Sequence, residues 1–310
     1  MPSLRLAAVA AALAFAATGC ATAQEAPPQA ATTRTVTDAT GTQVAVPTQP
    51  KRVIALSEQD LDGALALGVK PVGTVNGRGQ KTPPAYLNSQ ITGIAVVGDV
   101  AKPTMDKVIA ANPDLILAGS VTDAQILTQL RQVAPTVVTY QPADDWMKAL
   151  RNLGDALGKT DAVTQWFTTY EAKLAEAKGK LGSNSSAKVS LVRWNPQGPG
   201  VMQTEHFASL VTKDLGLTRP AAQNEKGFAH TAPLSLEQLS IVDGDVIFVG
   251  TLNAEGETAL AKVKEVPAFQ QLEAVKKNRV VIVDGTVWTS RGGPLAALQV
   301  VDDVVKALKA

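Results

Sequence analysis

The chain has 310 residues and almost balanced charge, because 29 Lys and Arg stand against 28 Asp and Glu. This balance argues against nucleic acid as a partner, since proteins that bind duplexes carry a basic excess or a basic stripe. The only cysteine, Cys20, excludes an intramolecular disulfide, and one cysteine with two histidines is too small a set for a zinc site.

The N-terminal residues 1–20 are typical of an export signal. Residues 4–18 are apolar or small apart from Arg5, and this run is too short to cross a bilayer but suits the hydrophobic core of a signal peptide. Small residues lead directly into Cys20, an arrangement that resembles the lipobox of bacterial lipoproteins, in which the cysteine carries the lipid. An ordinary cleaved signal with an unmodified cysteine is the alternative interpretation.

The next segment, 21–34, is rich in Ala, Pro, Gln and Thr and poor in large apolar side chains, which predicts a disordered tether. The lipobox interpretation predicts that a lipid on Cys20 holds the mature chain at the membrane, outside the cytoplasm. Removing Arg5 with the signal leaves 28 basic residues (29 less one) against 28 acidic ones, so the mature chain carries no net charge.

Residues 35–158 alternate short apolar runs with helical patterns. The runs are rich in Val, Ile and Leu and do not alternate with polar residues, as expected for strands buried on both faces of a parallel sheet. Strands are expected at 52–56, 71–75, 95–97, 114–118 and 136–139. Helices are expected at 59–67, 104–111 and 123–133.

A long amphipathic helix is predicted between the two halves of the chain. From 161 to 181 the apolar side chains recur mostly every three or four positions, which places them on one helical face. They are Val163, Trp166, Phe167, Tyr170, Leu174, Ala177 and Leu181. Roughly 20 residues at about 1.5 Å each give a rod of about 30 Å, so we expect residues 159–182 to bridge two lobes.

Residues 183–310 repeat the alternation of strands and helices. Strands are expected at 188–193, 245–249 and 279–283, and helices at 207–215, 236–239, 268–275 and 294–308. Alternating elements of this kind indicate an α/β fold. The sequence therefore predicts two α/β lobes, 35–158 and 183–310, connected by the helix.

Seven stretches resemble one family in their order and spacing. They are "DATGTQVAVPTQPKRVIAL", "DLDGALALGVKPVGTV", "ANPDLILAG", "LRQVAPTVV", "LSLEQLSIVDGDVIFV", "FQQLEAVKKNRVVIVDGTVW" and "GPLAALQVVDDVVKAL". The chain resembles the FecB/BtuF-like substrate-binding lipoproteins, which deliver iron–siderophore complexes or cobalamin to ABC importers. The resemblance implies two Rossmann-like lobes joined by a single long helix, with the ligand cleft between them (a class III substrate-binding protein).

In open α/β sheets, ligands bind beyond the carboxyl ends of the strands, so residues that follow strands are candidates. We expect Arg78, Arg193 and Arg291 to hold an anionic ferric siderophore complex, because guanidinium groups are permanently charged and donate paired hydrogen bonds. The other candidate ligand-binding residues are Tyr140, Trp194 and Trp288 as an apolar wall, Ser57, and His230. His206, Phe207, Phe228 and His230 lie in longer loops that could also reach the cleft. Iron is expected as cargo in the ferric siderophore, with no resident cofactor and no direct metal ligand.

The resemblance also implies a partner, the membrane permease of an ABC transporter. In the family, one carboxylate on each lobe pairs with permease arginines, and the matching positions here are Asp106 and Glu237. Both are expected at helix starts, where a carboxylate also stabilises the helix end, so a capping role is the alternative. We expect the protein to act as a monomer.

Other functions stay open or are disfavoured. Cobalamin or haem is the alternative ligand, and a surface signalling or adhesion lipoprotein that retains the fold is the alternative role. The sequence has no nucleophile elbow, phosphate loop or metal-binding cluster, so we do not expect an enzyme.

Overall fold

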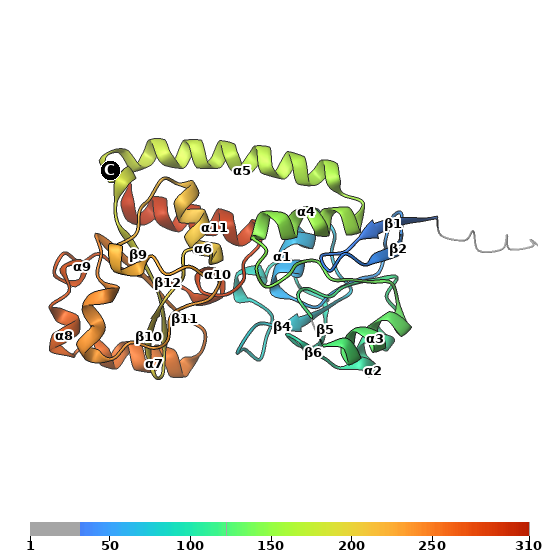
Figure 1. Cartoon of the computed structure of the whole chain (residues 1–310), viewed down its shortest axis with the longest axis horizontal. Coiled ribbons are helices and arrows are strands. Elements are labelled where there is room, and N and C mark those ends of the chain that lie inside the picture. Colours follow the sequence, from blue (N-terminus) through green and yellow to red (C-terminus); the bar gives the residue numbers. More distant parts are fainter. Residues whose placement is uncertain (1–31, 122, 310) are drawn as a thin grey trace, which may run out of the picture. The chain divides into compact units, whose positions relative to one another are not determined.

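The computed structural model describes residues 32–121 and 123–309. The predicted signal peptide, Cys20 and the tether up to Ala31 lie outside the described residues. From Thr32 onward the chain forms one compact unit that contains two larger sheets flanked by helices and a separate two-stranded sheet (Figure 1). We call the six-stranded sheet with helices α1 to α4 the N-lobe, and the four-stranded sheet with helices α6 to α10 the C-lobe. Within the described ranges no helix is both long enough and apolar enough to cross a membrane.

The N-lobe sheet has the strand order β6-β5-β4-β3-β7-β8, parallel except for the β5–β6 pair. Its central strands are fully buried, which explains their unbroken apolar sequence. The strand order reverses direction between β3 and β7, and such a reversal opens a crevice at the carboxyl ends of the strands. The strands are β3 (Val53–Ala55), β4 (Gly73–Asn76), β5 (Ala95–Asp99), β6 (Lys102–Pro103), β7 (Leu115–Leu117) and β8 (Thr136–Val137).

Side-chain caps start three of the N-lobe helices. Ser57, Asp123 and Asp145 each accept a backbone N–H of the first turn of α1, α3 and α4. The helices are α1 (Glu58–Ala66), α2 (Met105–Ala110), α3 (Ala124–Val133) and α4 (Trp146–Leu157), with a short 3-10 turn η1 (Ala85–Leu87). Helix α4, at 146–157, was not predicted.

An antiparallel hairpin, β1 (Thr33–Thr37) and β2 (Gln43–Pro47), opens the described chain. Thr33 and Arg34 are therefore strand residues, so the predicted tether over 21–34 is wrong at these two positions. The Arg34 guanidinium donates to the backbone carbonyls of Asp155 and Ala156, which fastens the hairpin to the end of α4. The sequence did not predict this strand, because β1 has only one buried side chain, Val36, and follows a segment that is poor in large apolar residues.

The predicted long helix is α5 (Thr160–Leu181), which links the two sheets in the chain. All of its predicted apolar residues except Phe167 are buried. Gly182, with φ of +50°, follows the last residue of the helix in a positive-φ conformation that glycine adopts without steric cost. Figure 1 shows α5 running past α4 of the N-lobe and α11 at the chain end.

The C-lobe sheet has the order β10-β9-β11-β12, parallel except for the β9–β10 pair. Its strands are β9 (Val189–Asn195), β10 (Gly198–Val201), β11 (Val246–Thr251) and β12 (Val280–Asp284). The remaining helices are α6 (Phe207–Asp214), α7 (Ala254–Val263), α8 (Pro267–Gln270), α9 (Glu273–Lys276), α10 (Gly285–Trp288) and α11 (Pro294–Leu308). Short 3-10 helices are η2 (Gly182–Ser186), η3 (Ala221–Gln223) and η4 (Leu236–Val242).

Two predicted helices of the C-lobe differ from expectation. Residues 236–239 belong to a 3-10 helix, η4, and the single helix expected at 268–275 is divided into α8 and α9. The division follows from Asp243, whose carboxylate accepts the backbone N–H groups of Glu273 (2.8 Å) and Ala274 (3.0 Å) and so starts a second helix.

The last helix, α11, ties the lobes together. Asp62 of α1 is fully buried and accepts the backbone N–H groups of Leu295 (2.7 Å) and Ala296 (2.9 Å) and the hydroxyl of Tyr86 (2.7 Å). Burial raises the pKa of Asp62 to about 6, although the hydrogen bonds from these donors lower it in part. One N-lobe side chain therefore caps the helix that ends the chain.

Candidate functional site

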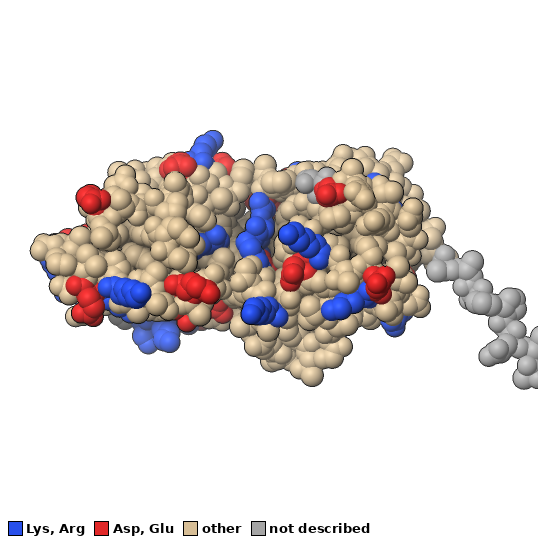
Figure 2. All heavy atoms as spheres, turned by 90° about the horizontal axis from the view of Figure 1, so that it is seen from below, with Lys and Arg blue, Asp and Glu red and all other residues tan. Residues whose placement is uncertain are grey.

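A cavity of about 640 Å³ lies between the lobes. On the face turned away from α5, basic side chains gather around the hollow between the two halves (Figure 2). The N-lobe contributes Arg78, Ser120 and Pro142, and the C-lobe side contributes Arg193, Gln203, His206, Gly227, Phe228, Ala229, His230, Thr289, Ser290 and Arg291. The three predicted arginines and His230 thus line a single cavity.

Sheet topology explains why residues from distant segments meet here. Arg78 follows β4, Arg193 lies near the carboxyl end of β9, and Arg291 stands between α10 and α11. At the point where the N-lobe strand order reverses, Gly119 follows β7 with φ of +56°, and a Cβ there would lie 2.7 Å from Ser57 Cβ. Glycine therefore allows the two strand ends to approach each other.

Arg193 is the most embedded of the three cations. Burial, and then the charge of Arg78, lower the pKa of Arg193 to about 10, while Glu58 opposes this shift. Its Nε is buried and has no hydrogen-bond partner among the described residues. Two guanidinium groups are therefore held near each other, and one of them keeps an unused donor. Such a pair favours an anionic ligand with several acceptor oxygens.

Arg291 reaches from the C-lobe side to the N-lobe. Its guanidinium carbon lies 5.4 Å from the centre of the Tyr140 ring, and its Nη2 donates to the Pro142 carbonyl at 2.6 Å. Cation–π contact and a carbonyl acceptor keep the guanidinium at the cavity wall.

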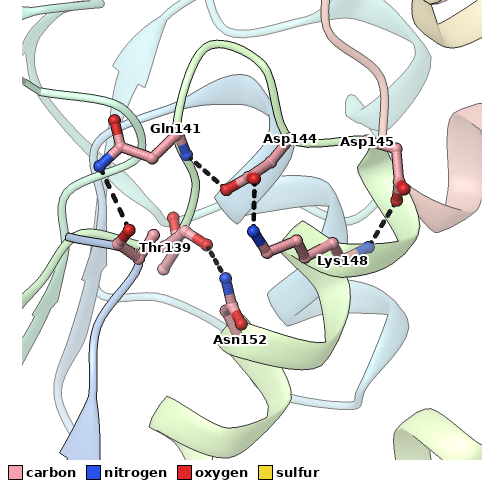
Figure 3. A network of polar contacts seen from close by, with 7 residues as sticks. Thr139, Gln141, Asp144, Asp145, Lys148 and Asn152 are labelled. Atoms are coloured by element: carbon pink, nitrogen blue, oxygen red, sulfur yellow. Dashed lines mark hydrogen bonds and ion pairs between the residues drawn. The ribbon is translucent and has the colours of Figure 1, made fainter. Parts of the chain in front are cut away.

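The N-lobe segment that receives Arg291 is fixed by polar contacts (Figure 3). Asp144 accepts the Gln141 backbone N–H at 2.8 Å and the Lys148 ammonium at 2.6 Å. Asn152 donates to the Thr139 carbonyl at 3.0 Å. Tyr140 and Pro142 are thus carried by a segment with little freedom to shift.

Tyr140 and Ser57 lie behind the cavity lining. Both are buried, and Ser57 is occupied as the cap of α1, with its Oγ 3.0 Å from the Asp60 backbone nitrogen. Asp60 is also buried and accepts from the Thr139 hydroxyl, and burial raises its pKa to about 6. These residues support the wall from behind, and Tyr140 contributes through its contact with Arg291.

Trp194 and Trp288 do not form the predicted apolar wall, which is a correction. Trp194 is 4 % exposed and packs on Phe269, while Trp288 is 1 % exposed and stacks on Phe248 with centroids 4.5 Å apart. Successive side chains of a strand point to opposite faces, so Arg193 and Trp194 in β9 cannot both face the cavity. Phe228 is the aromatic ring found in the lining.

The two histidines present different ring nitrogens. His206 Nδ1 accepts the Ala208 backbone N–H at 3.3 Å, so its proton resides on Nε2. His230 Nδ1 lies 2.8 Å from the Thr231 carbonyl oxygen and must therefore be the donor. His206 is 3 % exposed, and burial together with Arg193 and Arg291 lowers its pKa to about 3. Its ring is therefore a neutral hydrogen-bond donor at physiological pH.

This low pKa predicts a pH effect on stability. In the unfolded chain His206 is protonated near pH 6.5, whereas in the folded chain it is protonated only near pH 3. The contribution of neutral His206 to the free energy of unfolding is therefore complete above pH 6.5 and is lost as the pH falls toward 3. Relative to His206→Asn, which keeps a cap, the wild type should lose about 2 kcal/mol of unfolding free energy between pH 7 and pH 5. Urea unfolding at both pH values measures this; parallel losses in the two proteins would contradict it.

Sequence reasoning missed Gln203, Thr289 and Ser290. Gln203 accepts the Ala229 backbone N–H at 3.0 Å and so holds the loop that carries Phe228 and His230. No local motif marks these residues. Among the described residues, no cluster of three or more His, Cys, Asp or Glu side chains could hold a metal ion.

Asp106 and Glu237 are exposed and lie in the first turns of α2 and η4. A hydrogen bond with Ser235 lowers the pKa of Glu237. Each carboxylate lies close in sequence to an exposed apolar side chain, Ile109 (56 % exposed) and Leu236 (50 % exposed) respectively.

Comparisons with known proteins all find similarity to substrate-binding proteins. The profile of the periplasmic binding protein family matches residues 53–286. The "Probable siderophore-binding lipoprotein YfiY" of Bacillus subtilis is 31% identical over 283 residues, which cover 88% of this chain and 86% of that protein. The achromobactin-binding periplasmic protein of Dickeya dadantii is 25% identical over 264 residues, covering 83% of this chain and 86% of that protein. The crystal structure of Staphylococcus aureus SirA complexed with staphyloferrin B has a TM-score of 0.76 at 25% identity, covering 89% of this chain and 98% of that one.

Proposed function

Because the chain belongs to the periplasmic binding protein family, we propose that it binds an anionic ferric siderophore in the interlobe cavity and delivers it to an ABC importer. The observation that carries this proposal is the convergence of Arg78, Arg193 and Arg291 on one cavity. The family and the relatives are binding proteins, which confirms the predicted class and the expectation of a binding protein rather than an enzyme.

The chemistry of the lining favours this ligand over cobalamin or haem. Ferric siderophores surround the metal with carboxylate, catecholate or hydroxamate oxygens, which guanidinium groups recognise through charge and paired donors. A flat macrocycle would instead require a broad aromatic surface, and Phe228 is the aromatic side chain in the lining.

Thermal unfolding with a panel of iron-loaded siderophores tests the proposal. A ligand that binds only the folded state at 100 times its Kd should add about 2.7 kcal/mol to the unfolding free energy. The matched iron-free siderophores serve as controls. If no ferric complex of any charge stabilised the protein, the proposed function would be wrong.

The same proposal places the protein outside the cytoplasm. The signal peptide at 1–20 would direct export, and a lipid on Cys20 would hold the mature chain at the membrane next to its permease, where it would act as a monomer. If Cys20→Ala left the protein in the membrane fraction of detergent-free cell lysates, the lipid assignment would be wrong.

Docking on the permease is proposed to use Asp106 and Glu237. Reversing both charges, in Asp106→Lys with Glu237→Lys, should abolish iron uptake by cells while leaving ligand affinity within about twofold, because both residues are exposed and absent from the cavity lining. The control reverses two exposed carboxylates of α5, Asp161 and Glu171, and should keep uptake. Loss of ligand binding in the first variant would contradict the docking role.

A further inference from the structure

Glu58, the first residue of α1, holds parts of both lobes. Its side chain is almost completely buried, with the residue 6 % exposed. One carboxylate oxygen accepts the backbone N–H of Arg78 at 2.7 Å, and the other accepts the hydroxyl of Ser290. Ser290 directly precedes Arg291, so a single carboxylate fixes the segments that carry two of the three cavity arginines.

The same carboxylate opposes the arginine charges. Glu58 raises the pKa of Arg193, whereas Arg78 lowers it, so the Glu58 carboxylate acts on Arg193 in the direction opposite to Arg78. Two other buried carboxylates of α1 have different partners: Asp60 accepts from Thr139, and Asp62 caps α11. Glu58 is therefore the carboxylate of α1 that is bonded to residues of the cavity lining.

We propose that Glu58 is a specificity-determining residue that sets how strongly the cavity prefers highly charged ferric complexes over less charged ones. Its carboxylate offsets part of the guanidinium charge and also positions Arg78 and Ser290. The inference rests on the proposed function, since it concerns the charge of a ferric ligand in this cavity. A cavity with three unopposed guanidinium groups would favour the most highly charged complexes most strongly. With Glu58 in place, the cavity prefers highly charged complexes over less charged ones by a smaller factor.

Two substitutions separate the charge of Glu58 from its hydrogen bonds. Glu58→Gln removes the charge but keeps the contacts, because its amide oxygen accepts from Arg78 N–H and its amide nitrogen donates to the Ser290 hydroxyl. Glu58→Ala removes charge and contacts together. Glu171→Gln is the matched control, with the same chemical change at an exposed position on α5.

The experiment measures the Kd of each protein for two probes, a trianionic ferric triscatecholate and a neutral ferric trihydroxamate, at low and high salt. Glu58→Gln should raise the affinity ratio of the anionic to the neutral probe by about tenfold at low salt, and high salt should reduce the gain. Glu171→Gln should leave the ratio at the wild-type value. Glu58→Ala should also weaken binding of the neutral probe, which Glu58→Gln should not do, because Arg78 and Ser290 lose the carboxylate that positions them.

The outcomes distinguish this inference from the proposed function. If the wild type binds at least one probe and Glu58→Gln has the wild-type ratio, the charge role of Glu58 is wrong and the proposed function stands. If the wild type binds neither probe, nor any ferric complex in the thermal panel, both are wrong. Thermal unfolding of each variant without ligand confirms that the compared proteins are folded.

Discussion

Arg193→Met should lower the affinity for an anionic ferric complex by about a hundredfold or more. Arg193 is the deeply placed cation of the cavity, its Nε has no partner among the described residues, and Arg78 lies close enough to depress its pKa. Removing one member of a desolvated, hydrogen-bonded charge pair costs about 2–5 kcal/mol, and each 1.4 kcal/mol is about a tenfold change in Kd. Fluorescence titration or calorimetry measures the change.

The same substitution should not destabilise the protein without ligand. Burial and the Arg78 charge both disfavour the charged guanidinium, and methionine retains an apolar stem of similar length, so the melting temperature should stay constant or rise. Arg131→Met, at an exposed position of α3, is the control and should bind as the wild type does. Unchanged affinity in Arg193→Met would remove the main support for anion capture.

Asp62→Ala should lower the free energy of unfolding by about 3 kcal/mol or more. The substitution leaves two backbone N–H groups at the start of α11 and the Tyr86 hydroxyl without their acceptor in a buried place, and each buried unsatisfied group costs about 1–3 kcal/mol. Relief of the desolvated charge offsets part of this loss. Urea unfolding at pH 7 gives the difference.

Asp123→Ala provides a matched comparison, because Asp123 also caps a helix with two N–H acceptances but does so at an exposed position of α3. That variant should lose only about 1 kcal/mol. Tyr86→Phe removes one of the three donors to Asp62 and should fall between the two. Equal losses for Asp62→Ala and Asp123→Ala would show that Asp62 acts as an ordinary cap rather than as a joint between lobes.

The sequence was most informative where one periodicity persisted over many residues. Apolar spacing between Val163 and Leu181 predicts α5 almost to its ends, and the final helix at 294–308 coincides with α11. Two features were not predicted, the hairpin of β1 and β2 and the division of α8 from α9. Both depend on partners distant in the chain, because Arg34 contacts Asp155 and the Asp243 carboxylate accepts the Glu273 backbone N–H.

The candidate site was predictable only in part. The expectation that arginines follow strands named three side chains that line one cavity, but only Arg78 closely follows a strand, whereas Arg193 lies inside β9 and Arg291 lies between α10 and α11. The strand periodicity of β9 already contained the reason why Trp194 faces away from Arg193. Glu58 and Ser290 are 232 positions apart, and no local pattern predicts that contact. The proton position on His206 follows from its role as the cap of α6, which depends on the folded backbone and on no sequence motif.

The cap that Asp62 places on α11 limits how the lobes can move. The chain passes from the N-lobe sheet to the C-lobe sheet once, through α5, and a single rod would let the halves swivel about its axis. The second attachment removes that torsional degree of freedom, so the facing walls keep their mutual orientation before any ligand arrives. Ligand binding then requires little loss of orientational entropy to align the two lobes, so the free energy of each guanidinium contact contributes almost fully to the affinity.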